Sequence, residues 1–148
     1  TPIIHNESQE FHIGKAITLR DGSDSTIAAC GITVKTALDA ADLLKQDGIS
    51  CGVIDSFSVK PIDKDLLEKA VRQTGSIVTC EEHNIMGGFG SAVSEVISET
   101  YPVPIRRIGV QDKFGESARD NEVHQLFEKH GITSINIANA VKDARQKQ

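Results

Sequence analysis

The stretch Glu-Glu-His-Asn-Ile-Met-Gly-Gly-Phe-Gly-Ser-Ala-Val, residues 81–93, decides the fold class of this chain. It separates two apolar segments of different pattern. The run before it, residues 76–80, has the composition of a strand, whereas the apolar residues between Ala92 and Ile97 fall on one helical face. We therefore expect the polar motif at the carboxyl end of a strand, the edge at which open α/β sheets build their sites.

Strand and helix patterns alternate along the rest of the chain. Strand composition is found at residues 15–19, 26–31, 51–57, 77–81 and 105–110. Helical spacing is found at residues 33–48, 63–74, 91–100, from 123 until Gly131, and at 137–144. Asp63 is expected to cap the second of these helices and Gly75 to end it. This alternation predicts a mostly parallel sheet covered by helices on both faces.

Length, charge and hydropathy exclude several classes of protein. The 148 residues predict one domain that buries roughly 68–70% of its unfolded surface. Acidic residues outnumber basic ones by 21 to 16 and aromatic residues make up only 4%, which argues against nucleic acid as a partner. No apolar run approaches the roughly 20 residues needed to span a bilayer, and the amino terminus shows no signal pattern. We expect no membrane contact and a cytoplasmic location.

The cysteines and histidines do not predict a metal site. Cys30, Cys51 and Cys80 are widely spaced and each stands among apolar residues, so we expect buried free thiols in a reducing compartment. No pair of histidines or cysteines has the spacing that zinc ligands use, and His124 and His130 do not share a helical face. A metal ion held by this chain alone is not expected.

The glycines of the opening motif allow two interpretations. Gly87, Gly88 and Gly90 precede a helix, where free amides and the helix dipole can bind an anion. A dinucleotide fingerprint, however, needs its glycines directly after the strand and an acidic residue about 20 positions later, and neither is present. Close packing of the helix on the sheet, which excludes side chains, is the favoured interpretation.

The three titratable residues of the same motif also allow two interpretations. Glu81 and His83 alternate on a strand and could share a side, while Glu82 faces away. A carboxylate beside a histidine can support general base catalysis. No nucleophile is close in sequence, so we favour salt bridges or hydrogen bonds to a neighbouring subunit at a domain edge.

The polar segment 112–117 follows the last strand, with Arg106 and Arg107 just upstream. It could bind a phosphate, but a capped turn with solvated charges is the favoured interpretation.

Several motifs together resemble the carboxyl-terminal domain of transketolase and its relatives, which include deoxyxylulose phosphate synthase and the β subunits of the 2-oxoacid dehydrogenases. They are Phe-His-Ile-Gly-Lys-Ala at 11–16, Gly-Ser-Asp-Ser-Thr-Ile at 22–27 leading to Gly31, Glu-Glu-His at 81–83, Gly-Gly-Phe-Gly-Ser-Ala-Val at 87–93 and Ile-Gly-Val-Gln-Asp-Lys-Phe-Gly-Glu-Ser at 108–117. The Glu-Glu-His and Phe-Gly-Glu-Ser forms look more like transketolase than like the dehydrogenase subunits.

This resemblance implies a three-layer α/β/α fold with a five-stranded, mostly parallel mixed sheet. The pattern of the residues agrees in strand number if 15–19 is the antiparallel strand. The resemblance also implies that residues 1–12 are a linker or arm from a preceding pyrimidine-binding domain and that 13–148 form the transketolase C-terminal domain.

Transketolases transfer two-carbon ketol units between sugar phosphates. They use thiamine diphosphate and a divalent metal, Mg or Ca, held between a pyrophosphate-binding and a pyrimidine-binding domain. Neither domain fits within this chain, so the resemblance implies no catalytic, cofactor-binding or metal-binding residue in it, and the isolated chain is expected to be inactive.

The implied role is assembly and dimerisation of the complete enzyme, in the pentose phosphate pathway. The expected partners are the pyrimidine- and pyrophosphate-binding domains, in the same or a separate chain, together with homodimeric contacts. The candidate interface or motif residues are Glu81, Glu82, His83, Gly87, Gly88, Gly90, Ser91, Phe114, Gly115 and Ser117.

Two alternatives remain open. One is a free-standing anion- or nucleotide-binding α/β module that uses the glycine turn. The other is the C-terminal domain of a 2-oxoacid dehydrogenase β subunit, which would dock a core acyltransferase partner.

Overall fold

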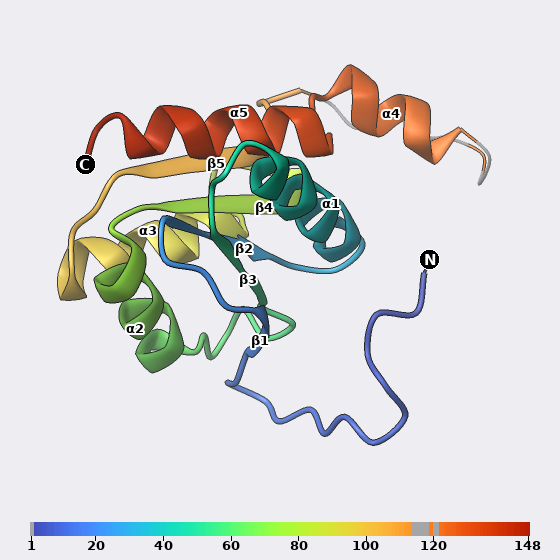
Figure 1. The fold of residues 1–148 in the computed structure, drawn as a ribbon. Helices are drawn as coiled ribbons and strands as arrows, with labels where there is room; N and C mark the ends of the chain where they lie inside the picture. Colours follow the sequence, from blue (N-terminus) through green and yellow to red (C-terminus); the bar gives the residue numbers. More distant parts are fainter. Residues whose placement is uncertain (1, 114–118, 120–121) are drawn as a thin grey trace.

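The computed structural model describes residues 2–113, 119 and 122–148 and has a mixed sheet of five strands in the order β1-β3-β2-β4-β5 (Figure 1). β1 pairs antiparallel with β3, and the other neighbouring strands are parallel. The strands are β1 (Ile17–Arg20), β2 (Ser25–Ala29), β3 (Cys51–Asp55), β4 (Ile77–Asn84) and β5 (Ile105–Val110). The predicted five-stranded mixed sheet is confirmed, with its odd strand at the expected place.

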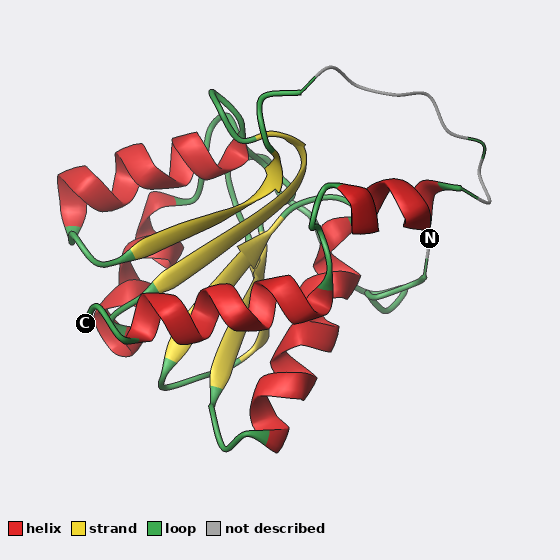
Figure 2. Cartoon of the chain, turned by 90° about the horizontal axis from the view of Figure 1, so that it is seen from above, coloured by secondary structure: helices red, strands yellow, loops and turns green. Residues whose placement is uncertain are grey.

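Helices cover both faces of this sheet, as the alternating pattern predicted (Figure 2). The helices are α1 (Thr33–Gln46), α2 (Lys64–Thr74), α3 (Phe89–Thr100), α4 (Val123–Lys129) and α5 (Ser134–Arg145). α1 and α5 contact each other on one face, and α2 and α3 contact each other on the opposite face. No helix in the described part of the chain combines the length and apolar character that a membrane span requires.

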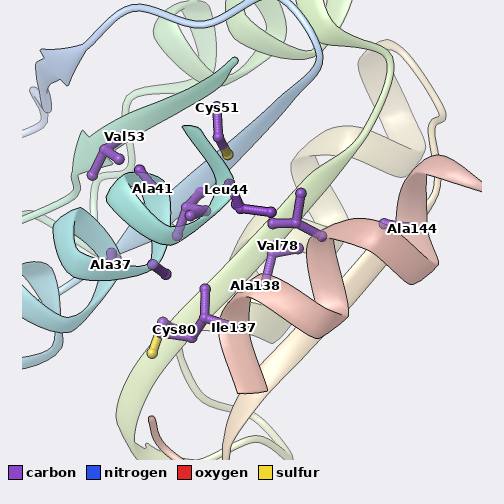
Figure 3. Close-up of a cluster of buried hydrophobic side chains, with 14 of the residues drawn as sticks. Ala37, Ala41, Leu44, Cys51, Val53, Val78, Cys80, Ile137, Ala138 and Ala144 are labelled. Carbon is purple, nitrogen blue, oxygen red and sulfur yellow. The ribbon is translucent and has the colours of Figure 1, made fainter. Parts of the chain in front are cut away.

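Two apolar clusters hold the three layers together. The cluster beneath α1 and α5 includes Leu44, Val53, Val78 and Ile137, all fully buried (Figure 3). The cluster beneath α2 and α3 is smaller and includes Ala28, Leu67, Val71 and Val93. Adjacent residues of β2 point to opposite clusters, because successive side chains of a strand face opposite sides of the sheet. The sheet is therefore apolar on both faces, as parallel sheets in α/β domains are.

Local capping sets several helix boundaries. The Asp63 side chain accepts a hydrogen bond from the Leu66 backbone N–H at 3.1 Å, and Gly75 ends α2 with a left-handed φ of 72°. Both features were predicted. α5 begins earlier than its apolar pattern indicated, because the Thr133 side chain accepts from the Asn136 N–H at 3.2 Å and caps the helix.

The two elements that flank the motif also differ from prediction. β4 continues past Glu81 to Asn84, since Asn84 still pairs with Val110 of β5 beyond an irregularity in the ladder. α3 begins at Phe89 rather than Ser91. The turn between them is thus shorter than the sequence pattern suggested.

The arm before β1 is held at the carboxyl end of β3. His5 Nε2 lies 2.7 Å from Asp55 Oδ2, and the ring of Phe11 makes edge contacts with those of His5 and Phe57. The Gly14 backbone N–H donates to Ser58 Oγ at 2.9 Å. This end of the arm therefore shares an edge of the sheet with the β4–α3 turn.

Candidate functional site

Glu81 is the buried centre of the motif. Only 1% of this residue is exposed, although it belongs to a run of charged residues. Its Oε2 accepts from the Phe89 N–H at 2.6 Å and its Oε1 accepts from the Gly90 N–H at 2.8 Å. These amides belong to the first turn of α3, where N–H groups have no partner within the helix and the dipole favours a negative charge. The carboxylate therefore caps α3 from the strand that precedes it.

Two of the glycines make room for this carboxylate and for the sheet. A Cβ on Gly88 would lie 2.1 Å from Glu81 Oε2 and 2.4 Å from the Asn84 carbonyl oxygen. A Cβ on Gly90 would lie 2.6 Å from Thr79 Oγ1. The close packing favoured from the sequence is thus found at both positions. Gly87 differs, because it has no atom near its missing Cβ but has a left-handed φ of 77°.

The other polar groups of the turn are engaged within the chain as well. The Met86 N–H donates to Asn84 Oδ1 at 2.8 Å, and the Gly87 N–H donates to Ser91 Oγ at 3.0 Å. Arg107 Nη1 donates to the carbonyl oxygen of Ile85 at 2.8 Å. The amides of Gly87, Phe89 and Gly90 already have partners within the chain, so the geometry does not favour the anion-binding alternative.

Glu82 and His83 lie outside this network. Both are exposed, and the Glu82 carboxylate lies beside Gly31, where a Cβ would be 2.6 Å from its Oε1. His83 has no hydrogen bond to Glu81, whose oxygens both bind α3. The general-base pair of Glu81 and His83 is therefore not assembled. The partner of Glu81 is also not a neighbouring subunit, because the packing of α3 on the sheet buries this carboxylate inside the chain.

The remaining candidates have structural partners. Arg106 pairs with Asp143 of α5, and Arg107 binds the β4–α3 turn. Both arginines are therefore engaged within the chain, which does not favour a phosphate site next to the segment that follows β5. Phe114, Gly115 and Ser117 lie outside the described residues.

The three cysteines are free, and Cys51 and Cys80 are buried as expected, whereas Cys30 is only partly buried. Burial is the largest cause that raises the pKa of Cys30, Cys51 and Cys80 to about 12 in each case. Such thiols remain protonated and are poor nucleophiles and metal ligands. Within the described ranges, no group of three or more His, Cys, Asp and Glu side chains is arranged to hold a metal ion.

Sequence reasoning missed the apolar residues around the motif. Met86 in the β4–α3 turn is 65% exposed, and Ile13, directly after the arm, is 88% exposed. Val59, in the loop that follows β3, is also exposed. Met86 belongs to the motif at residues 81–93. An apolar residue in a polar turn is a sequence signal for an exposed contact residue, and this signal could have identified Met86. All three exposed residues belong to segments near the carboxyl ends of the strands.

The fold and this site define a class of protein. It is a three-layer α/β/α domain in which a glutamate of the preceding strand, Glu81, binds the helix amides that follow the glycine-rich turn. The model of the family "Transketolase, C-terminal domain" matches residues 14–137. The chain belongs to this family.

Related proteins match nearly the whole chain. It is 41% identical over 145 residues to the 6-deoxy-6-sulfo-D-fructose transketolase subunit SqwH of Clostridium sp., a match that covers 98% of this chain and 44% of the relative. It is 42% identical to a subunit of the apulose-4-phosphate transketolase of Phocaeicola vulgatus, over 91% of this chain and 42% of that protein.

A solved structure described as "Split gene transketolase, inactive beta4 tetramer" superposes with a TM-score of 0.93 and 43% identity, over 99% of this chain and 47% of the other. The chain therefore spans less than half the length of these relatives.

Proposed function

We propose that this chain is the carboxyl-terminal part of an enzyme that transfers two-carbon ketol units between sugar phosphates. In the complete enzyme, thiamine diphosphate and a divalent metal would be held by a pyrophosphate-binding and a pyrimidine-binding domain, in the same or a separate chain. The role of the present chain is to assemble these domains and to contribute to dimerisation, in the cytoplasm. It holds no cofactor by itself.

The observation that carries this proposal is the match of nearly the whole chain to less than half of each named transketolase subunit. A domain that is one part of a larger enzyme needs a surface for the other parts. The exposed apolar residues Ile13, Val59 and Met86 near the carboxyl ends of the strands support such a surface, because exposed apolar side chains favour protein–protein contact.

The turn that carries Met86 is suited to a contact role. Hydrogen bonds from Arg107 and to Ser91 and Asn84 hold it in one conformation. A surface that is already ordered loses less conformational entropy on binding. We therefore include Glu82, His83 and residues 86–88 in the contact surface, whereas Glu81 supports it from inside.

The proposal is tested by using the tagged chain to recover partners from extracts of its source cells. The eluate is then assayed for ketol transfer that depends on thiamine diphosphate. We expect a larger polypeptide and this activity to be recovered together. Recovery of neither from extracts that contain ketol-transfer activity would contradict the proposal.

The anion-binding alternative makes a different prediction. A free-standing module would be stabilised by its ligand, by about 2.7 kcal/mol at 100 times the dissociation constant. Because the amides of Gly87, Phe89 and Gly90 already have partners, we expect inorganic phosphate and nucleotides to leave the thermal midpoint of the isolated chain unchanged.

A further inference from the structure

A groove of about 540 Å³ begins at the β4–α3 turn and runs between two segments of the chain. One wall is the segment 59–64, which leads into α2, and the other is the outer side of residues 87–99, mostly α3. The apolar lining includes Pro61 and Ala92. The groove is thus continuous with the contact surface proposed above, through Gly87 and Gly88.

The walls of the groove carry opposite charges. Lys60 and Lys64 line the wall at 59–64, whereas Glu95 and Glu99 line the α3 wall. The four residues are exposed, and within the described part of the chain none of their side chains forms an ion pair. Unpaired charges of one sign on each wall, with apolar residues between them, present a complementary surface to a partner whose charges are arranged in the opposite way.

The geometry of the walls selects a helix as the occupant. Among the described residues no strand lines the groove, so an extended peptide would find no open sheet edge with which to pair. A helix binds instead through side chains, with an apolar stripe in the groove and polar flanks outside it. Glu95 and Glu99 are four residues apart on α3, about 6 Å along its axis. Cations four residues apart on a partner helix match this spacing.

We propose that this groove docks an amphipathic helix of the polypeptide that carries the cofactor-binding domains, an inference that rests on the proposed function. The partner helix carries Lys or Arg on the flank that faces α3 and Asp or Glu on the flank that faces 59–64. Its apolar stripe lies over Pro61 and Ala92. The exposed side chain of Met86, which precedes the lining residue Gly87 in the chain, adds an apolar contact.

The test inverts the charges of the groove without changing the net charge of the chain. The variant Lys60→Glu/Lys64→Glu/Glu95→Lys/Glu99→Lys keeps the composition of the wild type, because its two pairs of reversals cancel. The matched control Asp21→Lys/Lys45→Glu also keeps the net charge and changes exposed residues away from the groove. Each chain is co-expressed with the cofactor-binding polypeptide, and the dissociation constant and association rate are measured at low and high salt.

We expect the inverted groove to weaken the complex by about tenfold or more, mainly through the association rate, because like charges then face each other. The control is expected to bind as the wild type does. The neutral variant Glu95→Gln/Glu99→Gln provides a milder change, with an expected loss of about threefold and a weaker dependence on salt. Thermal midpoints of the isolated chains check that folding is unchanged.

The outcomes separate this inference from the function on which it rests. A wild-type complex with ketol-transfer activity, together with unchanged affinity in the inverted variant, overturns the groove and leaves the proposed function in place. Failure of the wild-type chain to form any complex overturns both. Loss of affinity in the control as well as in the inverted variant also overturns the groove, since the effect would then not be local.

Discussion

The turns that follow β2 and β4 lie on adjacent parallel strands but are built differently. After β2 the chain enters α1 on one face of the sheet, and after β4 it enters α3 on the other. α1 has no side-chain cap, and its buried Thr33 hydroxyl contacts the carbonyl oxygens of Cys30 at 2.8 Å and Cys80 at 3.0 Å. α3 is capped by the Glu81 carboxylate.

This pair of turns marks the point where the connections reverse direction, which is where open α/β sheets bind ligands. In this chain, Glu81 and Glu82 of β4 lie at this point between the β2–α1 and β4–α3 turns. Glu82 lies beside Gly31 at the β2–α1 turn, and Glu81 binds the first amides of α3. The usual ligand position of the fold thus holds two carboxylates of the chain itself.

The largest expected effect is at Gly88, which tests whether the β4–α3 turn depends on close packing. We expect Gly88→Asp to lower the free energy of unfolding by more than about 3 kcal/mol, because its Cβ would lie 2.1 Å from Glu81 Oε2 and add a second carboxylate. Assembly with the cofactor-binding polypeptide should weaken too. Urea unfolding measures the first effect and gel filtration the second.

Gly87→Asp is the matched control, since nothing lies within 4 Å of the missing Cβ of Gly87 and only its left-handed φ of 77° is strained. We expect a loss of about 1 kcal/mol there. Equal losses at Gly87 and Gly88 would show that packing against Glu81 is unimportant.

The next effect distinguishes the two carboxylates. We expect Glu81→Gln to lower the free energy of unfolding by about 2 kcal/mol. The charge-assisted hydrogen bonds to α3 are lost, and the side-chain NH₂ of the glutamine would face a backbone N–H, which is also a donor. Glu82→Gln, at an exposed position, should stay within about 0.5 kcal/mol of the wild type. The measurement is chemical denaturation at neutral pH. Similar values for both variants would refute the assignment of the cap to Glu81.

A smaller effect is expected at two threonines near these turns, Thr33 at the start of α1 and Thr79 in β4. Thr33→Val should lower the free energy of unfolding by about 1 kcal/mol, because it removes a buried hydroxyl that is hydrogen-bonded. Thr79 Oγ1 is buried beneath Gly90 without a partner among the described residues, so Thr79→Val should be neutral or stabilising. The thermal midpoints of the two variants test this prediction. A larger drop in the midpoint for Thr79→Val than for Thr33→Val would contradict it.

The last prediction concerns pH and the thiols. The pKa of each cysteine rises from 9.0 to about 12 in the folded chain, so above pH 9 the unfolded chain loses protons that the folded chain keeps. The contribution of the thiols to the free energy of unfolding is therefore fully present below pH 9 and is lost as the pH rises toward 12. Iodoacetamide should label Cys30 first, because it alone of the three is partly exposed. Prior labelling of Cys51 or Cys80 in the native chain would contradict this order.

Much of the fold could be predicted from local patterns. The alternation of strand and helix segments, the cap at Asp63 and the helix end at Gly75 all depend on residues close in sequence, and all are found. The start of α3 was misplaced because its capping group is eight residues away, at Glu81. Cap patterns in sequence cover only the neighbouring positions.

The site was less predictable than the fold. The sequence shows Glu81, Glu82 and His83 as similar polar residues in a row, and strand alternation paired the first with the third. The packing of α3 on the sheet instead buries Glu81 and leaves Glu82 and His83 exposed. The groove between 59–64 and 87–99 could not be predicted, because its walls come from separate parts of the chain.

The fold class, the family resemblance and the need for small residues before α3 could all be predicted from the amino-acid sequence, since they follow from local periodicity, turn chemistry and motif order. Three further properties became visible in the folded chain alone: which carboxylate is buried, which turn amides are hydrogen-bonded, and which charged residues line opposite walls of the groove. These properties depend on how distant segments pack, and packing sets burial, which in turn sets the chemistry of each side chain.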